Sequence, residues 1–255
     1  EMRVVVPDLV SNSYFPAVAA VELGFFKAEG LDAELQHIFP VPKSYEALKN
    51  GEVDFVAGAA HSVLTAFPGW QGAKLVVALA QHMYWMLILR SDLGAKRRDV
   101  EAVKGLRIGA APGPDVGFRR LLVEAGIDLE KDKVDVGPVP GAVGAGVSFG
   151  VHAAHCLEDG TIDGFWANGM GSEVAVRSGV GTVILDVRRG DGPPAARSYT
   201  FPALVTLEST ITSNPEGVAG AVRAIVNVQK ALKADPSRAT EVGNRLFPET
   251  EAGLI

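Results

Sequence analysis

The stretch FPAVAAVELGFFKAEGLDAEL, residues 15–35, contains the pattern that decides the fold. Its apolar residues recur at helical spacing from Phe15 to Leu23, and Gly24 is suited to end that helix. The next apolar run predicts a strand over Ala33–Ile38. A helix that leads through a short connection into a strand is typical of α/β proteins.

The alternation of strands and helices continues along the chain. A strand is predicted at Arg3–Val6, and further apolar runs predict strands at Asp54–Gly58, Leu75–Ala80, Tyr84–Arg90, Leu106–Ala110, Ile162–Trp166, Thr182–Asp186 and Tyr199–Leu207. Helices are predicted between most of them. The clearest helix start is Asn214-Pro215, where Asn can cap the helix and Pro can take its first position. One apolar face of a long helix is then predicted, formed by Val218, Val222, Ile225, Val228 and Leu232. The predicted fold class is therefore α/β, with largely parallel sheets.

Composition limits the possible functions. The 255 residues suffice for one or two domains, and 47% hydrophobic residues can bury a large core. A formal net charge of −6 argues against a nucleic-acid binder, and the single cysteine, Cys156, excludes intrachain disulfides and cysteine-rich zinc sites. The apolar stretch Leu75–Leu89, which Gln81 and His82 interrupt, is shorter than a membrane-spanning helix. No signal peptide is recognised, so the sequence indicates either a cytoplasmic protein or one whose leader has been removed.

Three short motifs with functional precedents carry little weight. Gly146–Gly150 fits the G-x-S-x-G pattern of serine hydrolases, but a glycine-rich loop precedes it and the last histidine, His155, is too close to act as the base. Ser148 is better explained as a helix cap. The cluster His152–Cys156 offers too few ligands for a structural metal site. The segment Gly169–Gly171 lacks the third small residue of a dinucleotide fingerprint.

Four loops that follow predicted strands and lead into helices are the strongest functional signal. They are Ser11–Phe15, Gly58–Ser62, Gly113–Val116 and Trp166–Met170. Ligands of open α/β sheets bind at the carboxyl ends of strands, where free N–H groups and the helix dipole favour an anion. Each loop alone is explained as an ordinary connection, but the four together favour a binding cleft.

The candidate ligand-binding residues come from these loops and from three further positions. They are Asn12, Ser13, Tyr14, Phe15, Ala60, His61, Ser62, His82, Pro114, Asp115, Val116, Ser148, Trp166, Asn168 and Tyr199. Their amides and hydroxyls can form hydrogen bonds, and the aromatic rings indicate a partly apolar ligand. A structural role explains the two histidines equally well, as core packing explains Phe15. Asp115 is unsuited to an anion and would cap the following helix or bind an amine or hydroxyl.

Several segments resemble, in order, motifs of the periplasmic substrate-binding proteins of ABC importers. The opening stretch resembles their first helix and the G-[YF]-F-x-x-E-G-L-D signature after it. Four later segments resemble later motifs of these proteins: LKNGEVD at 48–54, VKGLRIG at 103–109, LEDGTIDG at 157–164 and NPEGV at 214–218. The group that is most similar is the nitrate, sulfonate, taurine and thiamine-precursor set, the NMT1/THI5-like family, and the resemblance covers nearly the whole chain.

The resemblance implies a type II periplasmic binding protein architecture. Such proteins have two α/β lobes with mixed, mostly parallel sheets and a two-strand hinge. Lobe 1 would comprise residues 1–85 and 203–255, and lobe 2 residues 86–202, with crossings at Tyr84–Arg90 and Tyr199–Leu204 and the ligand cleft between the lobes.

The function implied by the resemblance is the capture of a small organic molecule, anionic or aromatic, by hinge closure and its delivery to a permease in the inner membrane. The protein is then expected to be a monomer that is periplasmic or a cell-surface lipoprotein. No catalysis, cofactor, metal or nucleic-acid partner is implied.

The alternative function is an enzyme on the same fold, of the menaquinone-pathway or thiamine-precursor type, acting on a small organic acid. The thiamine-precursor synthases use a cysteine-rich motif, so the lone Cys156 argues against that activity. Members of the family usually continue beyond the position of Ile255. The segment Gly141–Gly150 is richer in glycine than the family leads us to expect, which suggests a ligand contact through Ser148.

Overall fold

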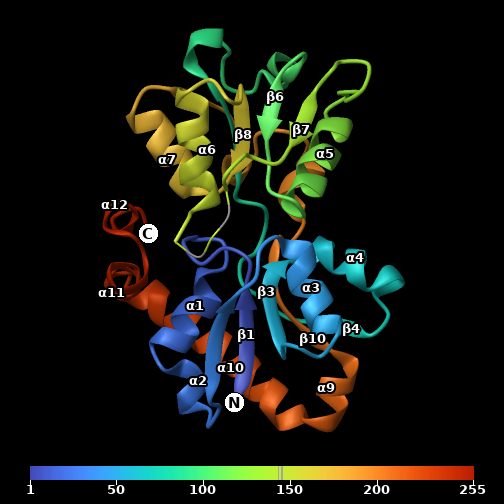
Figure 1. Ribbon diagram of the computed structural model, residues 1–255, viewed down its shortest axis with the longest axis vertical. Coiled ribbons are helices and arrows are strands. Elements are labelled where there is room, and N and C mark those ends of the chain that lie inside the picture. The colour runs from blue at the N-terminus through green and yellow to red at the C-terminus, as the bar shows by residue number, and fades with distance from the viewer. Residues whose placement is uncertain (143, 145) are drawn as a thin grey trace. The chain divides into compact units, whose positions relative to one another are not determined.

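The computed structural model describes residues 1–142, 144 and 146–255, so two positions of the glycine-rich segment, 143 and 145, lie outside the described residues. The chain divides into two units (Figure 1): unit 1 comprises Glu1–Ala80 and Thr200–Ile255, and unit 2 comprises Gln81–Tyr199. The chain therefore passes from one unit to the other after Ala80 and again after Tyr199. The boundaries expected from the sequence lie a few residues further along. Of the two segments expected to cross, Tyr84–Arg90 lies inside unit 2, whereas Tyr199–Leu204 contains the second boundary.

Unit 1 is built on a five-stranded sheet with the strand order β2-β1-β3-β10-β4. The strands are β1 Met2–Val6, β2 Ala33–His37, β3 Phe55–Ala59, β4 Ala73–Ala78 and β10 Pro202–Leu207. The pairs that β1 forms with β2 and β3 are parallel, whereas β10 is antiparallel to both of its neighbours, β3 and β4. Four strands thus run in one direction and β10 in the other, as in a mixed sheet.

Helices cover both faces of this sheet, which is why all five residues of β3 are buried. The helices are α1 Phe15–Glu22, α2 Phe25–Ala28, α3 Val41–Lys49, α4 Val63–Ala66, α9 Glu208–Ser213, α10 Pro215–Ala234, α11 Ser237–Leu246 and α12 Glu249–Ala252, with the short 3-10 turns η1 Ala60–Ser62 and η2 Pro68–Trp70. Helix α3 is held against β3 by the Tyr45 hydroxyl, which donates a hydrogen bond to the Ala59 carbonyl at 2.9 Å.

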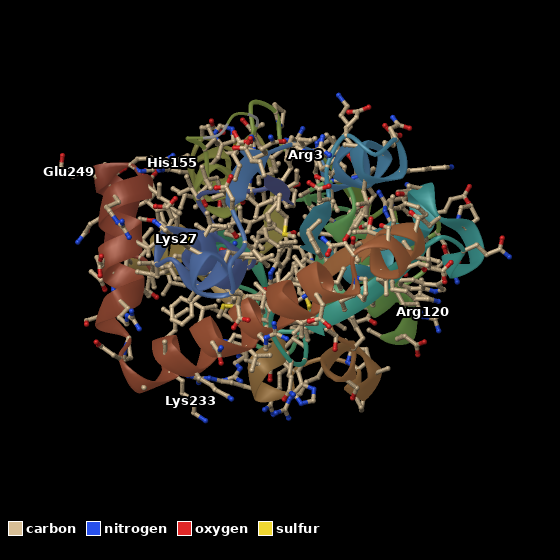
Figure 2. All side chains as sticks on the ribbon, turned by 90° about the horizontal axis from the view of Figure 1, so that it is seen from below. Arg3, Lys27, Arg120, His155, Lys233 and Glu249 are labelled. Carbon is tan, nitrogen blue, oxygen red and sulfur yellow. The ribbon has the colours of Figure 1, made fainter. Side chains whose placement is uncertain are left out.

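The long helix α10 begins as the sequence predicts. The Asn214 side chain accepts a hydrogen bond from the backbone N–H of Gly217 at 3.0 Å, and Pro215 takes the first helical position. Val218 and Ile225 of the predicted apolar face are buried. Exposed charged side chains such as Lys233 lie on the outside of the helix (Figure 2). The amphipathic pattern therefore identifies correctly which face of α10 packs on unit 1.

Unit 2 is built on a second five-stranded sheet, with the order β7-β6-β8-β5-β9. Its elements are β5 Met86–Arg90, β6 Arg107–Gly109, β7 Asp135–Gly137, β8 Gly164–Ala167, β9 Gly181–Asp186, α5 Pro114–Glu124, α6 Phe149–Glu158, α7 Gly169–Arg177 and α8 Pro194–Ser198, with the 3-10 turns η3 Ser91–Leu93, η4 Val100–Val103 and η5 Val187–Arg189. β6 is parallel to β7 and β8, and β5 is antiparallel to β8 and β9.

Successive residues of β8 face opposite sides of this sheet. Phe165 belongs to the apolar cluster that includes Phe149 and Ala153 of α6. The next residue, Trp166, stacks on Phe118 of α5 with ring centroids 5.2 Å apart. Helices α6 and α7 therefore lie on one side of the sheet and α5 on the other (Figure 1).

Two glycines bring the beginnings of α6 and α7 close together. A Cβ atom on Gly150 would lie 3.1 Å from the backbone nitrogen of Gly171, and a Cβ on Gly171 would collide with the backbone of Gly150. Glycine at both positions therefore permits backbone-to-backbone contact between the two helices, each of which follows a strand-to-helix connection.

The predicted α/β class, with mixed sheets, is confirmed. The sequence patterns missed short elements: α2, α8, α9, α12 and the strand β7. β7 has three residues, of which only Val136 is buried, so it shows too little alternation to be recognised. The predicted strand Tyr199–Leu207 begins later, at Pro202.

Candidate functional site

The candidate residues of unit 1 lie at one edge of its sheet. β1 and β3 are parallel neighbours, so the loop after Val6 and the turn that begins at Ala60 follow strand ends on the same edge. β10 enters at this edge, because its first residue, Pro202, pairs with the last residue of β3, Ala59. The backbone N–H of Ala60 donates to the Phe201 carbonyl at 2.7 Å and so fixes the turn against the start of β10.

An aromatic residue that the sequence patterns did not single out links the two loops. The Phe201 ring is fully buried, and its centroid lies 6.3 Å from that of Tyr14 and 6.1 Å from that of His61. Two predicted site residues from different loops thus share one neighbour. The prediction missed Phe201 because its role depends on where β10 enters the sheet, which the sequence does not show.

Two side chains at this edge each carry a buried polar atom that forms no hydrogen bond to any described residue. The Oδ1 atom of Asn12 and the Oγ atom of Ser62 are buried and have no hydrogen-bonding partner among the residues that the structure describes. Ser62 is only 2% exposed. Because a buried polar group left unpaired costs about 1–3 kcal/mol, such atoms mark a place where a ligand can supply the missing hydrogen bond.

The neighbouring candidates Ser13 and Phe15 form contacts within unit 1. The backbone N–H of Ser13 donates to the Ser11 hydroxyl at 3.0 Å, which shapes the loop before α1. Phe15 is 5% exposed and packs edge-on against Phe247, with ring centroids 6.2 Å apart. Core packing, one of the two roles considered for Phe15, is therefore what the structure shows.

In unit 2, Trp166 occupies the carboxyl end of β8. It is fully buried between Phe118 and Trp85, whose ring centroid lies 5.9 Å away. The indole Nε1, which can only donate, is buried without a hydrogen-bonding partner within the described part of the chain. The ring is thus part of an aromatic stack, and the indole N–H is the group that can donate a hydrogen bond to a ligand.

Two further candidates of unit 2 cap helices. Asn168 is 3% exposed, and its Oδ1 accepts from the backbone N–H of Met170 at 3.0 Å. The Ser148 hydroxyl accepts from the N–H of Val151 at 3.5 Å, which confirms the interpretation of Ser148 as a helix cap. Because Gly150 and Gly171 are in contact, these two capped helix starts lie close together.

The remaining candidates of unit 2 are placed less centrally. Asp115 accepts from the N–H of Gly113 at 3.0 Å and forms an ion pair with Arg119 at 3.1 Å, so both of its carboxylate oxygens are engaged at the start of α5. Pro114 is buried, whereas Val116 is 53% exposed. His82 is exposed. Tyr199 is half-buried, and burial raises the pKa of its hydroxyl to about 12, so the hydroxyl stays protonated at neutral pH.

The histidine–cysteine motif of α6 makes local contacts. His152 Nε2 lies 2.6 Å from the Pro140 carbonyl and 3.6 Å from Cys156 Sγ, and burial raises the pKa of the Cys156 thiol. Among the described residues, no cluster of three or more His, Cys, Asp or Glu side chains could hold a metal ion. Within the same residues, no helix has the length and apolar character needed to cross a membrane.

The two units have the fold of a type II periplasmic binding protein, as solved structures show. A protein from Bordetella bronchiseptica RB50 is 22% identical, with a TM-score of 0.77 over 98% of this chain and 76% of that one. The nitrate-binding protein NrtA of Synechocystis PCC 6803 is 16% identical, with a TM-score of 0.73 over 98% and 66%. The alkanesulfonate-binding protein SsuA of Xanthomonas axonopodis pv. citri, bound to MOPS, is 13% identical, with a TM-score of 0.72 over 99% and 82%.

The chain belongs to the NMT1/THI5-like family, whose sequence profile matches residues 11–239. The family expected from the sequence motifs is therefore confirmed. No curated protein sequence matches the chain significantly.

Proposed function

We propose that this chain is the solute-binding component of an ABC importer, which captures a small organic molecule and delivers it to a membrane permease. Membership of the NMT1/THI5-like family and the fold shared with nitrate- and sulfonate-binding proteins support this role. The observation that carries the proposal is a set of buried polar atoms on Asn12, Ser62 and Trp166 that have no hydrogen-bonding partner among the residues described. All three follow or end strands, where ligands of open α/β sheets bind.

The chemistry of these groups favours a singly charged anion with an aromatic or aliphatic body. The Ser62 hydroxyl and the Trp166 N–H can donate to oxygen atoms of a sulfonate or carboxylate, and the Asn12 amide can present either its oxygen or, turned over, its NH₂ group. None of the candidate site residues is Lys or Arg, so neutral hydrogen-bond donors would bind the anionic group of the solute. A doubly charged anion is a poorer match than a monoanion.

The proposed site residues fall into two sets. In unit 1, the residues that would contact the solute are Asn12, Tyr14, His61 and Ser62. The Phe201 ring would hold the Tyr14 and His61 rings in place by packing against both. In unit 2, the corresponding residues would be Trp166, Asn168 and Tyr199. Capture would involve a hinge movement at the two connections, after Ala80 and after Tyr199, and the protein would act in the periplasm or as a cell-surface lipoprotein.

A thermal-shift screen tests the proposal. The screen would include sulfonates, carboxylates, aromatic acids, amines, pyrimidines and nitrate. A ligand present at 100 times its Kd should add about 2.7 kcal/mol to the free energy of unfolding. We expect at least one monoanion to stabilise the wild-type protein and to stabilise the Asn12→Ala variant less.

Recovery of the ligand separates binding from catalysis. Chromatography after prolonged incubation should return the bound compound unchanged. Chemical conversion of the compound would instead favour the enzyme alternative, and stabilisation by none of the compound classes would contradict the proposed site.

A further inference from the structure

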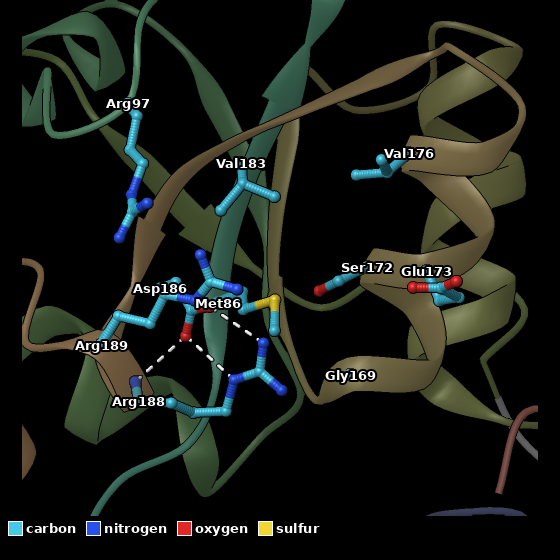
Figure 3. Close-up of a pocket in the computed structure, with 10 residues that line it drawn as sticks. All are labelled: Met86, Arg97, Gly169, Ser172, Glu173, Val176, Val183, Asp186, Arg188 and Arg189. Carbon is cyan, nitrogen blue, oxygen red and sulfur yellow. Dashed lines mark hydrogen bonds and ion pairs between the residues drawn. The ribbon is translucent and has the colours of Figure 1, made fainter.

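A pocket lies wholly within unit 2, between α7 and the strands β5 and β9 (Figure 3). Its volume is about 340 Å³, within the range of small-molecule sites. It is lined by Met86, Arg97, Gly169, Ser172, Glu173, Val176, Val183, Asp186, Arg188 and Arg189. None of these residues belongs to the proposed solute site.

One wall of the pocket is apolar. Met86 comes from β5 and Val183 from its neighbour β9, and Val176 faces them from α7. Val176 is 46% exposed, although it is a large hydrophobic side chain. Covering these three side chains with the apolar body of a ligand would remove hydrocarbon surface from water.

The other wall carries arginines that buried carboxylates hold in place. The Asp191 side chain is fully buried and accepts hydrogen bonds from Arg97 Nε at 2.7 Å and from Arg98 Nε at 2.7 Å. Burial alone would raise the pKa of Asp191, but hydrogen bonds from Arg97, from the Asp186 backbone and from Arg98 lower it to about 2. This carboxylate therefore remains charged at any physiological pH.

Asp186 forms ion pairs with two further arginines of this wall, Arg188 and Arg189. Its carboxylate accepts from Arg188 Nε at 3.0 Å and Nη2 at 2.9 Å, while Arg189 Nε lies 3.5 Å away. The Asp186 side chain is 7% exposed, whereas those of Arg188 and Arg189 are 50% and 67% exposed. Figure 3 shows the guanidinium groups gathered around Asp186, with α7 across the pocket.

The charges around this wall do not cancel. Arg97, Arg98, Arg188 and Arg189 carry four positive charges against two negative charges on Asp186 and Asp191. The Glu173 carboxylate, which lines the pocket from α7, forms an ion pair with Arg177, so two positive charges remain in a chain whose net charge is −6. Arginines fixed by carboxylates behind them are already oriented, so an anion binds with little further loss of side-chain freedom.

We propose that this pocket is an accessory site of unit 2 for a small organic anion with an apolar body. The apolar body would lie against Met86, Val176 and Val183, and the anionic group would face Arg189. Arg189 has the longest ion pair of the cluster and is therefore the arginine best able to turn toward a ligand.

Isothermal titration with naphthalene-1-sulfonate tests this proposal. We expect the wild-type protein to bind it and Arg189→Gln to bind it at least about fivefold more weakly. Val176→Glu should lose binding, because a further carboxylate, in addition to Glu173, would replace part of the apolar wall. The matched control is Arg120→Gln: Arg120 is 72% exposed and lies on α5 outside the pocket lining, so its removal changes the net charge equally and should leave binding unchanged.

Two further measurements separate this site from its alternatives. Binding that survives Arg189→Gln and Val176→Glu but is lost in Ser62→Ala would assign the probe to the proposed solute site and overturn the accessory site. Equal binding of inorganic sulfate would show that charge alone is recognised and would also overturn it. The outcome is independent of the solute screen, because the probe and the substituted residues differ.

Discussion

The hydroxyl of Ser62 offers the sharpest test of the proposed solute site. Ser62 is the last residue of η1, the turn that follows β3, and is 2% exposed. Its Oγ has no hydrogen-bonding partner among the described residues. An unpaired buried hydroxyl costs about 1–3 kcal/mol. Ser62→Ala removes that cost, so we expect the free energy of unfolding of the ligand-free protein to stay constant or to rise by about 1 kcal/mol.

A matched control exists in the same unit. Ser44 is fully buried, and its hydroxyl donates to the Ile38 carbonyl at 2.7 Å. Ser44→Ala leaves that carbonyl unpaired, so we expect a loss of about 1 kcal/mol. Two chemically identical substitutions should thus have different effects: Ser44→Ala lowers the free energy of unfolding, whereas Ser62→Ala leaves it constant or raises it. Urea-induced unfolding followed by circular dichroism measures both.

Solute binding by Ser62→Ala should weaken, although the stability of this variant does not fall. If Ser62 donates to an anionic group of the solute, its loss costs about 1.5–3 kcal/mol, which is about a tenfold to hundredfold weaker affinity. Isothermal titration with the strongest ligand of the screen measures this. A Ser62→Ala variant that is destabilised like Ser44→Ala and binds with unchanged affinity would refute the reasoning, because Ser62 would then be a packing residue.

Three further predictions concern other parts of the molecule. Trp166→Phe should keep the aromatic stack but weaken solute binding about tenfold, as titration would show; Trp166→Ala is a poor test, since truncating a buried Trp costs about 3–5 kcal/mol. Gly171→Ala should destabilise unit 2 by about 1–3 kcal/mol in urea unfolding, because the new Cβ meets the Gly150 backbone, whereas Gly253→Ala, with no described atom within 4 Å, should change stability little. Asp191→Asn should lower the free energy of unfolding by about 2 kcal/mol at pH 7. This difference from wild type should shrink as the pH falls from about 4 toward 2, because the lowered pKa of Asp191 stabilises the fold only while the carboxylate is ionised. An equal difference in the free energy of unfolding at pH 7 and pH 3 would contradict this.

Local rules in the sequence predicted local structure well. The Asn214 cap and the Ser148 cap both form as the residue types indicate, and the apolar face of α10 is the buried one. Each of these predictions depends on residues within about one or two helical turns, and the same rules apply wherever the helix packs.

Features that depend on strand order were not predictable. A tryptophan at the end of a strand, such as Trp166, can face a ligand or a helix, and periodicity cannot decide when both faces of the sheet are covered. The contact between Phe201 and the two loops requires that β10 enter beside β3, although more than a hundred residues separate them. The positive pocket of unit 2 likewise needs Arg97 and Arg189, which are far apart in the sequence, to line one pocket, and neither was singled out as a site residue from the sequence.

The position of β10 in the sheet of unit 1 has a consequence for biosynthesis. β10 lies between β3 and β4, but it is translated only after all of residues 81–199. A growing chain can therefore complete unit 2 first, while the first 80 residues still lack the strand that joins β4 to the rest. Until Leu207 has been synthesised, the hydrogen-bonding edges of β3 and β4 remain open to other chains. We expect the amino-terminal segment to be the part of the nascent protein that depends most on chaperones.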